Sequence, residues 1–146
     1  MADVSPNIQI LGDNMSEACV CVNLPASADT ATIDLNALAM AAGDGSDRVA
    51  ITGIQSNGSF NLKWDSDSDY AFFFGSGNVN IPMFISPIIM DQGRAGDNPT
   101  GDIIVTASST NVFIMIKLKK IAGFKGSSAR FKKLSGAIAS DGIGGY

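Results

Sequence analysis

The sequence predicts an all-β protein: a single-domain antiparallel β-sandwich, jelly-roll-like, with one short helix and an extended C-terminal arm. Apolar residues recur at every second position in several short segments, which is the period of a strand with one buried face. Turn residues separate these segments at the spacing typical of two-sheet β-proteins. The length of 146 residues suits one domain, and 45% hydrophobic against 16% charged residues favours a compact body.

The first strands are expected at residues 7–11, 17–24 and 30–35. The second contains both cysteines, Cys19 and Cys21, which lie two positions apart and project from one face of a strand. This spacing differs from the C-x-x-C of redox and zinc motifs and is too splayed for an easy mutual disulfide. We therefore expect two reduced cysteines that pack as small hydrophobes, which suits synthesis in a reducing cytoplasm.

One short helix is expected directly after the third strand. Asp34 can cap its N-terminus, and Gly43 can end it. Between these two residues the apolar positions recur at helical spacing, so one side of the helix should face the core. That side consists of Leu35, Leu38, Ala39 and Ala42.

A hairpin is predicted between the segments 49–55 and 59–65. Asn57 and Gly58 stand between them, and this dipeptide is typical of tight hairpin turns. Gly53 interrupts the alternation of the first strand, and a bulge there would bring neighbouring isoleucines onto one face. These isoleucines are Ile51 and Ile54, and the matching face of the second strand consists of Phe60, Leu62 and Trp64.

Later strands are expected at 70–75 and within 101–120, where a second hairpin turns at 108–111. The segment 80–102 contains three prolines, which indicates an extended connection and not a central strand. In the last strand Phe113 makes the second face apolar too, as in a central or covered strand. The predicted common faces are Tyr70, Phe72 and Phe74 in one strand, and Val112, Ile114, Ile116 and Leu118 in the other.

Residues 1–120 are expected to form the sandwich domain, and residues 121–146 a basic arm rich in glycine and serine. Residues 1–102 hold 13 acids and 3 bases, a net charge of −10, whereas residues 103–146 hold seven bases and Asp141, a net of +6. A chain with such uneven charge often meets a partner, or a neighbouring copy, through the unusual end. The expected interface residues are Phe124, Arg130, Phe131, Lys132, Lys133 and Tyr146.

Three aspartates, Asp65, Asp67 and Asp69, alternate beside the single tryptophan. A helix-loop-helix calcium site needs glycine at position 6 and glutamate at position 12. Counting from Asp65, those positions hold tyrosine and serine, so the motif does not match. A solvated loop and an opportunistic calcium site built from a β-turn both stay open. No resident cofactor is expected.

Enzymatic activity is not expected. The chain has no histidine, the commonest general base and metal ligand. Its glycine-rich pieces match neither the phosphate-binding loop nor the dinucleotide fingerprint, and no nucleophile elbow occurs. The net charge of −4 and the pI of about 4.5 argue against a nucleic-acid partner. No apolar run approaches a membrane span, and the first residues do not resemble a secretory signal.

A resemblance enters in residues 97–120, at Thr100–Val105 and Val112–Lys120. A T-G-D-I-V-like strand, a short Ser/Thr-rich turn and an apolar strand ending in lysine resemble the closing hairpin of small virion proteins of tailed phages, notably marine ones. The segment after Lys120 departs from that pattern. The resemblance implies a head-decoration or other capsid-associated protein on the virion surface, present as a small oligomer such as a trimer. Its partner would be a capsid or other virion protein.

The expected function is therefore that of a non-enzymatic decoration or cement protein, whose sandwich is a rigid plug and whose arm reaches a neighbouring subunit. The alternative is a carbohydrate-binding sandwich that uses Trp64 and Tyr70, with calcium at the aspartates. Against it, Trp64 shares a face with Phe60 and Leu62, a pattern typical of core residues.

Overall fold

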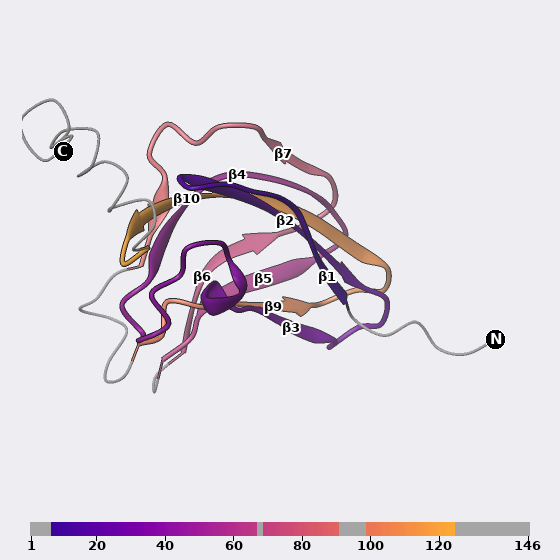
Figure 1. The fold of residues 1–146 in the computed structure, drawn as a ribbon. Helices are drawn as coiled ribbons and strands as arrows, with labels where there is room; N and C mark the ends of the chain where they lie inside the picture. Colours follow the sequence, from indigo (N-terminus) through magenta and orange to yellow (C-terminus); the bar gives the residue numbers. More distant parts are fainter. Residues whose placement is uncertain (1–6, 67–68, 91–98, 125–146) are drawn as a thin grey trace, which may run out of the picture.

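The computed structural model describes residues 7–66, 69–90 and 99–124, which form two packed antiparallel sheets. Figure 1 shows a six-stranded sheet arching over a four-stranded one. The six-stranded sheet contains β1 (Asn7–Asp13), β2 (Glu17–Leu24), β4 (Arg48–Asn57), β7 (Val79–Ile81), β8 (Ile88–Ile89) and β10 (Val112–Ala122). The four-stranded sheet contains β3 (Thr30–Ile33), β5 (Phe60–Trp64), β6 (Tyr70–Gly75) and β9 (Ile103–Ala107). The predicted all-β sandwich is confirmed.

The strand order of one sheet mirrors that of the other. The six-stranded sheet runs β1-β2-β10-β4-β7, with β8 beside β4, and the four-stranded sheet runs β3-β9-β5-β6. The connections β2–β3, β4–β5, β6–β7 and β9–β10 each cross between the sheets at the same end of the sandwich. Strands joined by these connections lie in opposite sheets. Among the described strands, β1 lies beyond β2 with no counterpart beyond β3.

The two predicted hairpins are wrong, although all four of their strands exist. The turns at Gly58 and at 108–111 carry the chain from one sheet to the other, because β4 pairs with β10 and β5 pairs with β9. The two turns support each other. The N–H of Ser108 donates to the carbonyl oxygen of Ser59 (2.7 Å), and the N–H of Ser59 donates to Oγ of Ser109 (2.9 Å). The Asn-Gly turn therefore connects strands of two different sheets and does not form a hairpin.

The inward faces follow the predicted alternation. The buried face of β10 consists of Val112, Ile114, Ile116 and Leu118, and β10 is central, as its two-faced apolar pattern predicts. The predicted bulge in β4 is present: the ladder with β10 shifts at Thr52, so that Ile51 and Ile54 are both buried. Gly53 permits a close approach, since a Cβ there would lie 2.8 Å from the carbonyl oxygen of Pro82.

The side chains of β6 do not alternate as predicted, because a bulge in its ladder with β5 makes Phe72 the extra residue. Phe72 stacks on Trp64, with 4.5 Å between the ring centroids, and Phe73 stacks on Phe60 at 6.0 Å. Phe74, expected to share a side with Phe72, is exposed. The bulge thus turns two consecutive aromatic rings toward the inside of the sandwich.

The predicted helix is only one 3-10 turn, η1 (Leu35–Ala37). Asp34 caps it as predicted, through a side-chain bond to the N–H of the second helical residue (2.9 Å). It ends early because Leu38 is extended (ψ 152°) and the N–H of Ala39 donates to Oδ2 of Asp13 (2.6 Å). Further along, the buried carboxylate of Asp47 accepts the N–H groups of Ala42 (2.9 Å) and Gly43 (3.1 Å) and holds them in a loop. Of the predicted apolar side, Leu35 and Leu38 are buried, whereas Ala39 and Ala42 are half-buried outside the helix.

Candidate interaction surfaces

The end of β10 is fixed by Lys120, whose side chain is buried. Its Nζ donates to Oδ1 of Asp13 (2.6 Å) and to the carbonyl oxygens of Asn14 (2.6 Å) and Ala39 (2.8 Å). An ammonium group has three N–H donors, so its hydrogen-bonding capacity is fully used. These bonds join β10 to the β1–β2 turn and to the loop after η1. Sequence reasoning counted Lys120 only as one of the seven bases of residues 103–146 and missed this role, although alternation from Leu118 places it on the inner face.

Phe124 is part of the core and not of an exposed arm. The chain turns at Gly123 (φ 85°), where a Cβ would lie 2.6 Å from the carbonyl oxygen of Ser46. Phe124 is only 3% exposed, and its ring centroid lies 5.1 Å from Nζ of Lys120. The predicted interface role of Phe124 is therefore wrong, and the sandwich extends beyond the predicted boundary at Lys120. The remaining predicted interface residues, Arg130, Phe131, Lys132, Lys133 and Tyr146, lie outside the described residues.

An apolar groove lies at the edge of the sandwich where β1 overhangs β3. Ile8 and Ile10 point to the inner side of the six-stranded sheet, because they pair with the buried residues Val22 and Val20. They are nevertheless 36% and 43% exposed. A cavity of about 240 Å³ lies between them and the residues of β3 and η1, with Leu38 at its wall. The edge of the core is thus open on this side.

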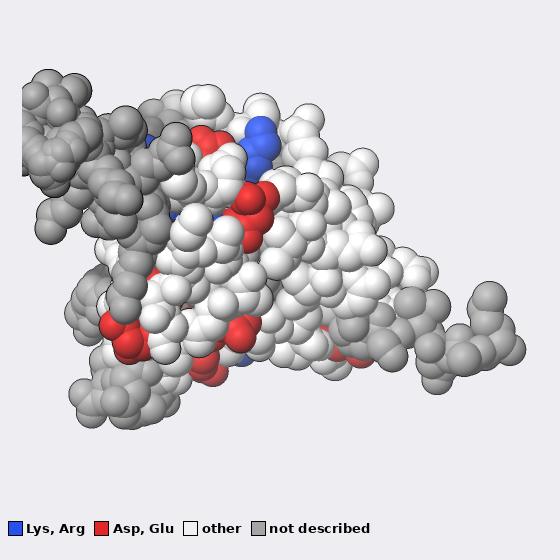
Figure 2. Space-filling model, viewed as in Figure 1, with Lys and Arg blue, Asp and Glu red and all other residues white. Residues whose placement is uncertain are grey.

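The surface as a whole is poor in charge. Figure 2 shows a largely uncharged face over β1 and β2. Near β8, Met83 and Ile85 are exposed, although Phe84 between them is anchored by its N–H bond to the carbonyl oxygen of Thr52 (2.8 Å) and by an edge contact with Phe73. The large hydrophobic side chains exposed among the described residues are Ile8, Ile10, Leu11, Met40, Phe74, Met83, Ile85, Ile89, Phe113 and Ile121.

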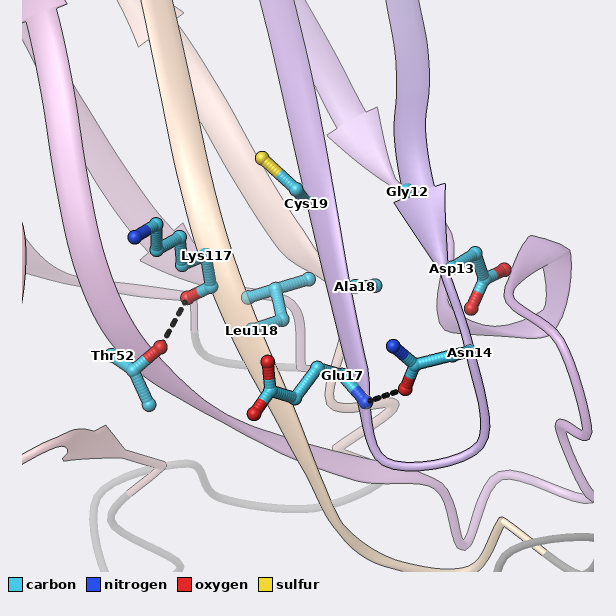
Figure 3. Close-up of a pocket in the computed structure, with 9 residues that line it drawn as sticks. All are labelled: Gly12, Asp13, Asn14, Glu17, Ala18, Cys19, Thr52, Lys117 and Leu118. Atoms are coloured by element: carbon cyan, nitrogen blue, oxygen red, sulfur yellow. Dashed lines mark hydrogen bonds between the residues drawn. The ribbon is translucent and has the colours of Figure 1, made fainter.

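A second cavity, of about 210 Å³, lies where the β1–β2 turn meets β10 and β4 (Figure 3). Its polar groups come from adjacent strands, and Cys19 pairs with Lys117 in the ladder between β2 and β10. The hydroxyl of Thr52 donates to the carbonyl oxygen of Lys117 (3.3 Å), and the N–H of Glu17 donates to Oδ1 of Asn14 (2.9 Å). These two hydrogen bonds hold the walls of the cavity in place. Neither of them joins a nucleophilic side chain to a general base.

The two cysteines are free thiols, as predicted. Cys19 is half-buried and Cys21 is buried. Burial raises the pKa of the Cys21 thiol above its usual 9.0, and the neighbouring Cys19 raises it further. Cys21 therefore stays protonated at neutral pH, which disfavours nucleophilic or metal-binding chemistry at this position.

The aspartate turn uses its carboxylates for local hydrogen bonds. Oδ2 of Asp65 accepts the hydroxyl of Thr100 (2.9 Å), and Oδ1 of Asp69 accepts the N–H of Ser66 (2.9 Å). Asp67 lies outside the described residues. Within the described parts of the chain, no group of three or more Cys, Asp or Glu residues is arranged to hold a metal ion. The opportunistic calcium site therefore stays a prediction.

Asp102, which sequence reasoning did not single out, is a carboxylate whose pKa the fold raises, mainly through burial. Burial raises the pKa of Asp102 above its usual 3.8, and the carboxylates of Asp34 and Asp65 raise it further. Its bonds to the N–H of Leu35 (2.9 Å) and to Thr100 act in the opposite direction. The Asp102 carboxylate thus joins η1 to the start of β9. Its negative charge is destabilised there by burial and by the neighbouring carboxylates.

We expect Asp102→Asn to raise the melting temperature at neutral pH, by an increment that grows as the pH rises from below 3.8. A pKa raised in the folded state means that the group favours folding when protonated, and this contribution is lost as the pH rises through the folded-state pKa. Asparagine stays neutral and keeps an oxygen for Leu35. Thermal melts across this range measure the effect, with the exposed Glu17→Gln as control. An increment that does not change with pH would contradict it.

The aromatic platform of the carbohydrate alternative is absent at Trp64. Its side chain is only 1% exposed and stacks on Phe72 inside the sandwich. A sugar platform needs an exposed ring face, so Trp64 serves the core, as its shared face with Phe60 and Leu62 predicts. Tyr70 is half-buried at the end of the same ladder. No described observation favours the carbohydrate function over the other.

No protein-family model and no curated protein matches the chain. In the part of the chain that the structure describes, no helix has the length and apolar character needed to cross a bilayer.

Proposed function

We propose that the chain is a non-enzymatic virion structural protein, a capsid decoration or cement protein that stabilises a phage head by associating with itself and docking on the shell. The observation that carries this proposal is the number of large apolar side chains exposed on a surface poor in charge. Ile8 and Ile10 lie together at the groove, and exposed apolar residues that gather in this way are typical of protein interfaces. A protein repeated on a symmetric shell gains avidity from many such contacts.

The strand order supports the proposal at the level of the fold. We interpret the sandwich as a jelly roll, because β2-β10-β4-β7 faces β3-β9-β5-β6 and four consecutive-strand connections cross at one end. Jelly rolls are frequent among viral capsid proteins, and also among lectins. Fold alone does not determine function, so this support is secondary to the surface.

The C-terminal segment supplies the second contact in this proposal. Residues 125–146 carry Lys125, Arg130, Lys132 and Lys133 against the single acid Asp141. The rest of the chain is acidic, so a basic segment complements the surface of a neighbouring copy or an acidic shell protein. A capsid or other virion protein is the proposed partner, and nucleic acid and membranes are not.

Multi-angle light scattering of the purified chain tests the proposal. We expect a mass that is a small multiple of 15.1 kDa, such as a trimer, and that decreases on dilution. A mass of one chain at every concentration would contradict self-association. A glycan panel run on the same sample addresses the carbohydrate alternative, because saturable sugar binding by a monomer would replace the assembly proposal with that one.

A further inference from the structure

We propose that the apolar groove between β1 and β3 receives the C-terminal segment, residues 125–146, of a neighbouring copy as an added strand beside β3. This inference rests on the proposed self-association and names the surface that mediates it. It starts from the mismatch of the two sheets, because β1 extends the six-stranded sheet past β2 while β3 ends the four-stranded sheet. A strand added beside β3 would lie under β1 and cover Ile8 and Ile10.

The edge of β3 is open to strand addition. Among the described residues β3 pairs only with β9, so the N–H and C=O groups on its other edge have no strand partner. Protective edges usually carry charged residues, proline or a bulge. The sequence of β3, Thr-Ala-Thr-Ile, contains no charge and no proline, and its ladder has no shift. Such an edge pairs readily with an extended peptide.

The C-terminal segment has the sequence of such a peptide. Within residues 134–140 the two large apolar side chains, Leu134 and Ile138, are four positions apart and would share one face of an extended strand, with the small residue Gly136 between them on that face. Seven residues extend about 23 Å, longer than the four residues of β3. One face can therefore fill the groove while the other, which contains serine and alanine, faces solvent.

The point where the described chain ends lies close to the groove. Phe124 packs beside Lys120, which binds Asp13 at the end of β1 and Ala39 in the loop after η1. The groove lies along the same β1 strand and beside η1. The nine residues from 125 to 133 can extend about 30 Å, enough to leave one copy and enter the groove of an adjacent one.

Charge favours the same pairing. Asp34 lines the groove, and the carboxylates of Asp65 and Asp102 act on one another close to it. Residues 125–133, which precede the proposed strand, contain Arg130, Lys132 and Lys133. Their positive charges are opposite in sign to the carboxylates at the groove. A terminal strand makes the same contacts in its own groove or in that of a neighbour, and exchange between copies links them into an oligomer.

Limited trypsin digestion of the full chain tests this inference, because trypsin cleaves after the arginine and lysines at 130–133. Mass spectrometry of the fragments counts only the cuts at 130–133 and so separates them from a cut at an introduced lysine. For those cuts we expect slow cleavage in concentrated protein and about tenfold faster cleavage on dilution or in Ile10→Lys, where a charge enters the groove. Ile8→Lys is a second groove variant. Asn78→Lys, exposed in the β6–β7 connection at the opposite edge of both sheets, is the control and should behave like the parent protein. Circular dichroism confirms that each variant is folded.

Equal cleavage rates in the parent and both groove variants at every concentration would overturn the inference. Protection that does not depend on concentration would place the segment in the groove of its own chain and would overturn the exchange. If the parent self-associates while its segment is cleaved as fast as in Ile10→Lys, the groove assignment fails and the proposed function stands. If the parent is monomeric throughout, the proposed function fails with it.

Discussion

Replacing Lys120 by methionine should destabilise the protein by about 3–5 kcal/mol, the cost of leaving a buried charge without its partner. Methionine fills a similar volume but leaves Oδ1 of Asp13 and the carbonyl oxygens of Asn14 and Ala39 without their shared donor. Urea denaturation of the full chain measures the change in the free energy of unfolding.

Lys119→Met is the matched control, because Lys119 is the neighbouring residue on the exposed face of β10. Its expected effect is within about 0.5 kcal/mol, as for ordinary surface substitutions. Equal losses of stability in the two variants would mean that Lys120 does not form the buried junction. A larger loss in Lys119→Met would contradict the orientation of the whole strand end.

Replacing Phe124 by alanine should cost about 3 kcal/mol or more, because it removes a buried aromatic ring and leaves a cavity. The ring also loses its contact with the ammonium group of Lys120. The measurement is again urea denaturation of the full chain, so that residues 125–146 are present in every sample. Ile121→Ala is the control; Ile121 is 42% exposed, so about 1 kcal/mol or less is expected.

A small effect of Phe124→Ala, equal to that of Ile121→Ala, would place Phe124 back in the arm where sequence reasoning put it. The expected result has a functional consequence. Lys120, Gly123 and Phe124 together fix the direction in which the chain leaves the sandwich, and they fix it next to the open groove. A substitution that loosens this exit should also weaken self-association.

Much of the fold follows from local sequence. The alternation of apolar residues predicts the buried face of β10 and the bulge beside Gly53, because burial on one face of a strand leaves a period of two in the sequence. The cap at Asp34 follows from the short range of its hydrogen bond. These features depend on residues that are close in the chain.

Features that depend on distant residues were not predicted. The Asn57-Gly58 turn is equally compatible with a hairpin and with a connection between the two sheets. The connection forms because β4 pairs with the distant strand β10 and not with β5. The helix ends where the N–H of Ala39 bonds to Asp13 of β1, and the alternation of β6 is broken by a bulge against β5. The burial of Lys120 depends on acceptors from β1 and from the loop after η1.

The candidate interaction surface was predicted only in outline. Composition and uneven charge pointed to an interface at the C-terminal end, but most of the named residues lie outside the described structure. The open groove at β1 is a property of strand order, which no single segment of sequence encodes. In the sequence, Ile8 and Ile10 look like ordinary buried strand positions. Their exposure follows only from the strand order, because no described strand of the four-stranded sheet lies opposite β1.

Assembly through the open edge is tested most directly by amide hydrogen exchange, measured by mass spectrometry at low and high protein concentration. A strand added to β3 supplies partners for its free N–H groups, so exchange at residues 30–33 should slow as the concentration rises. Exchange at the buried central strand β10 should not change, which controls for overall stability. Exchange at residues 30–33 that is the same at every concentration would contradict assembly through this edge.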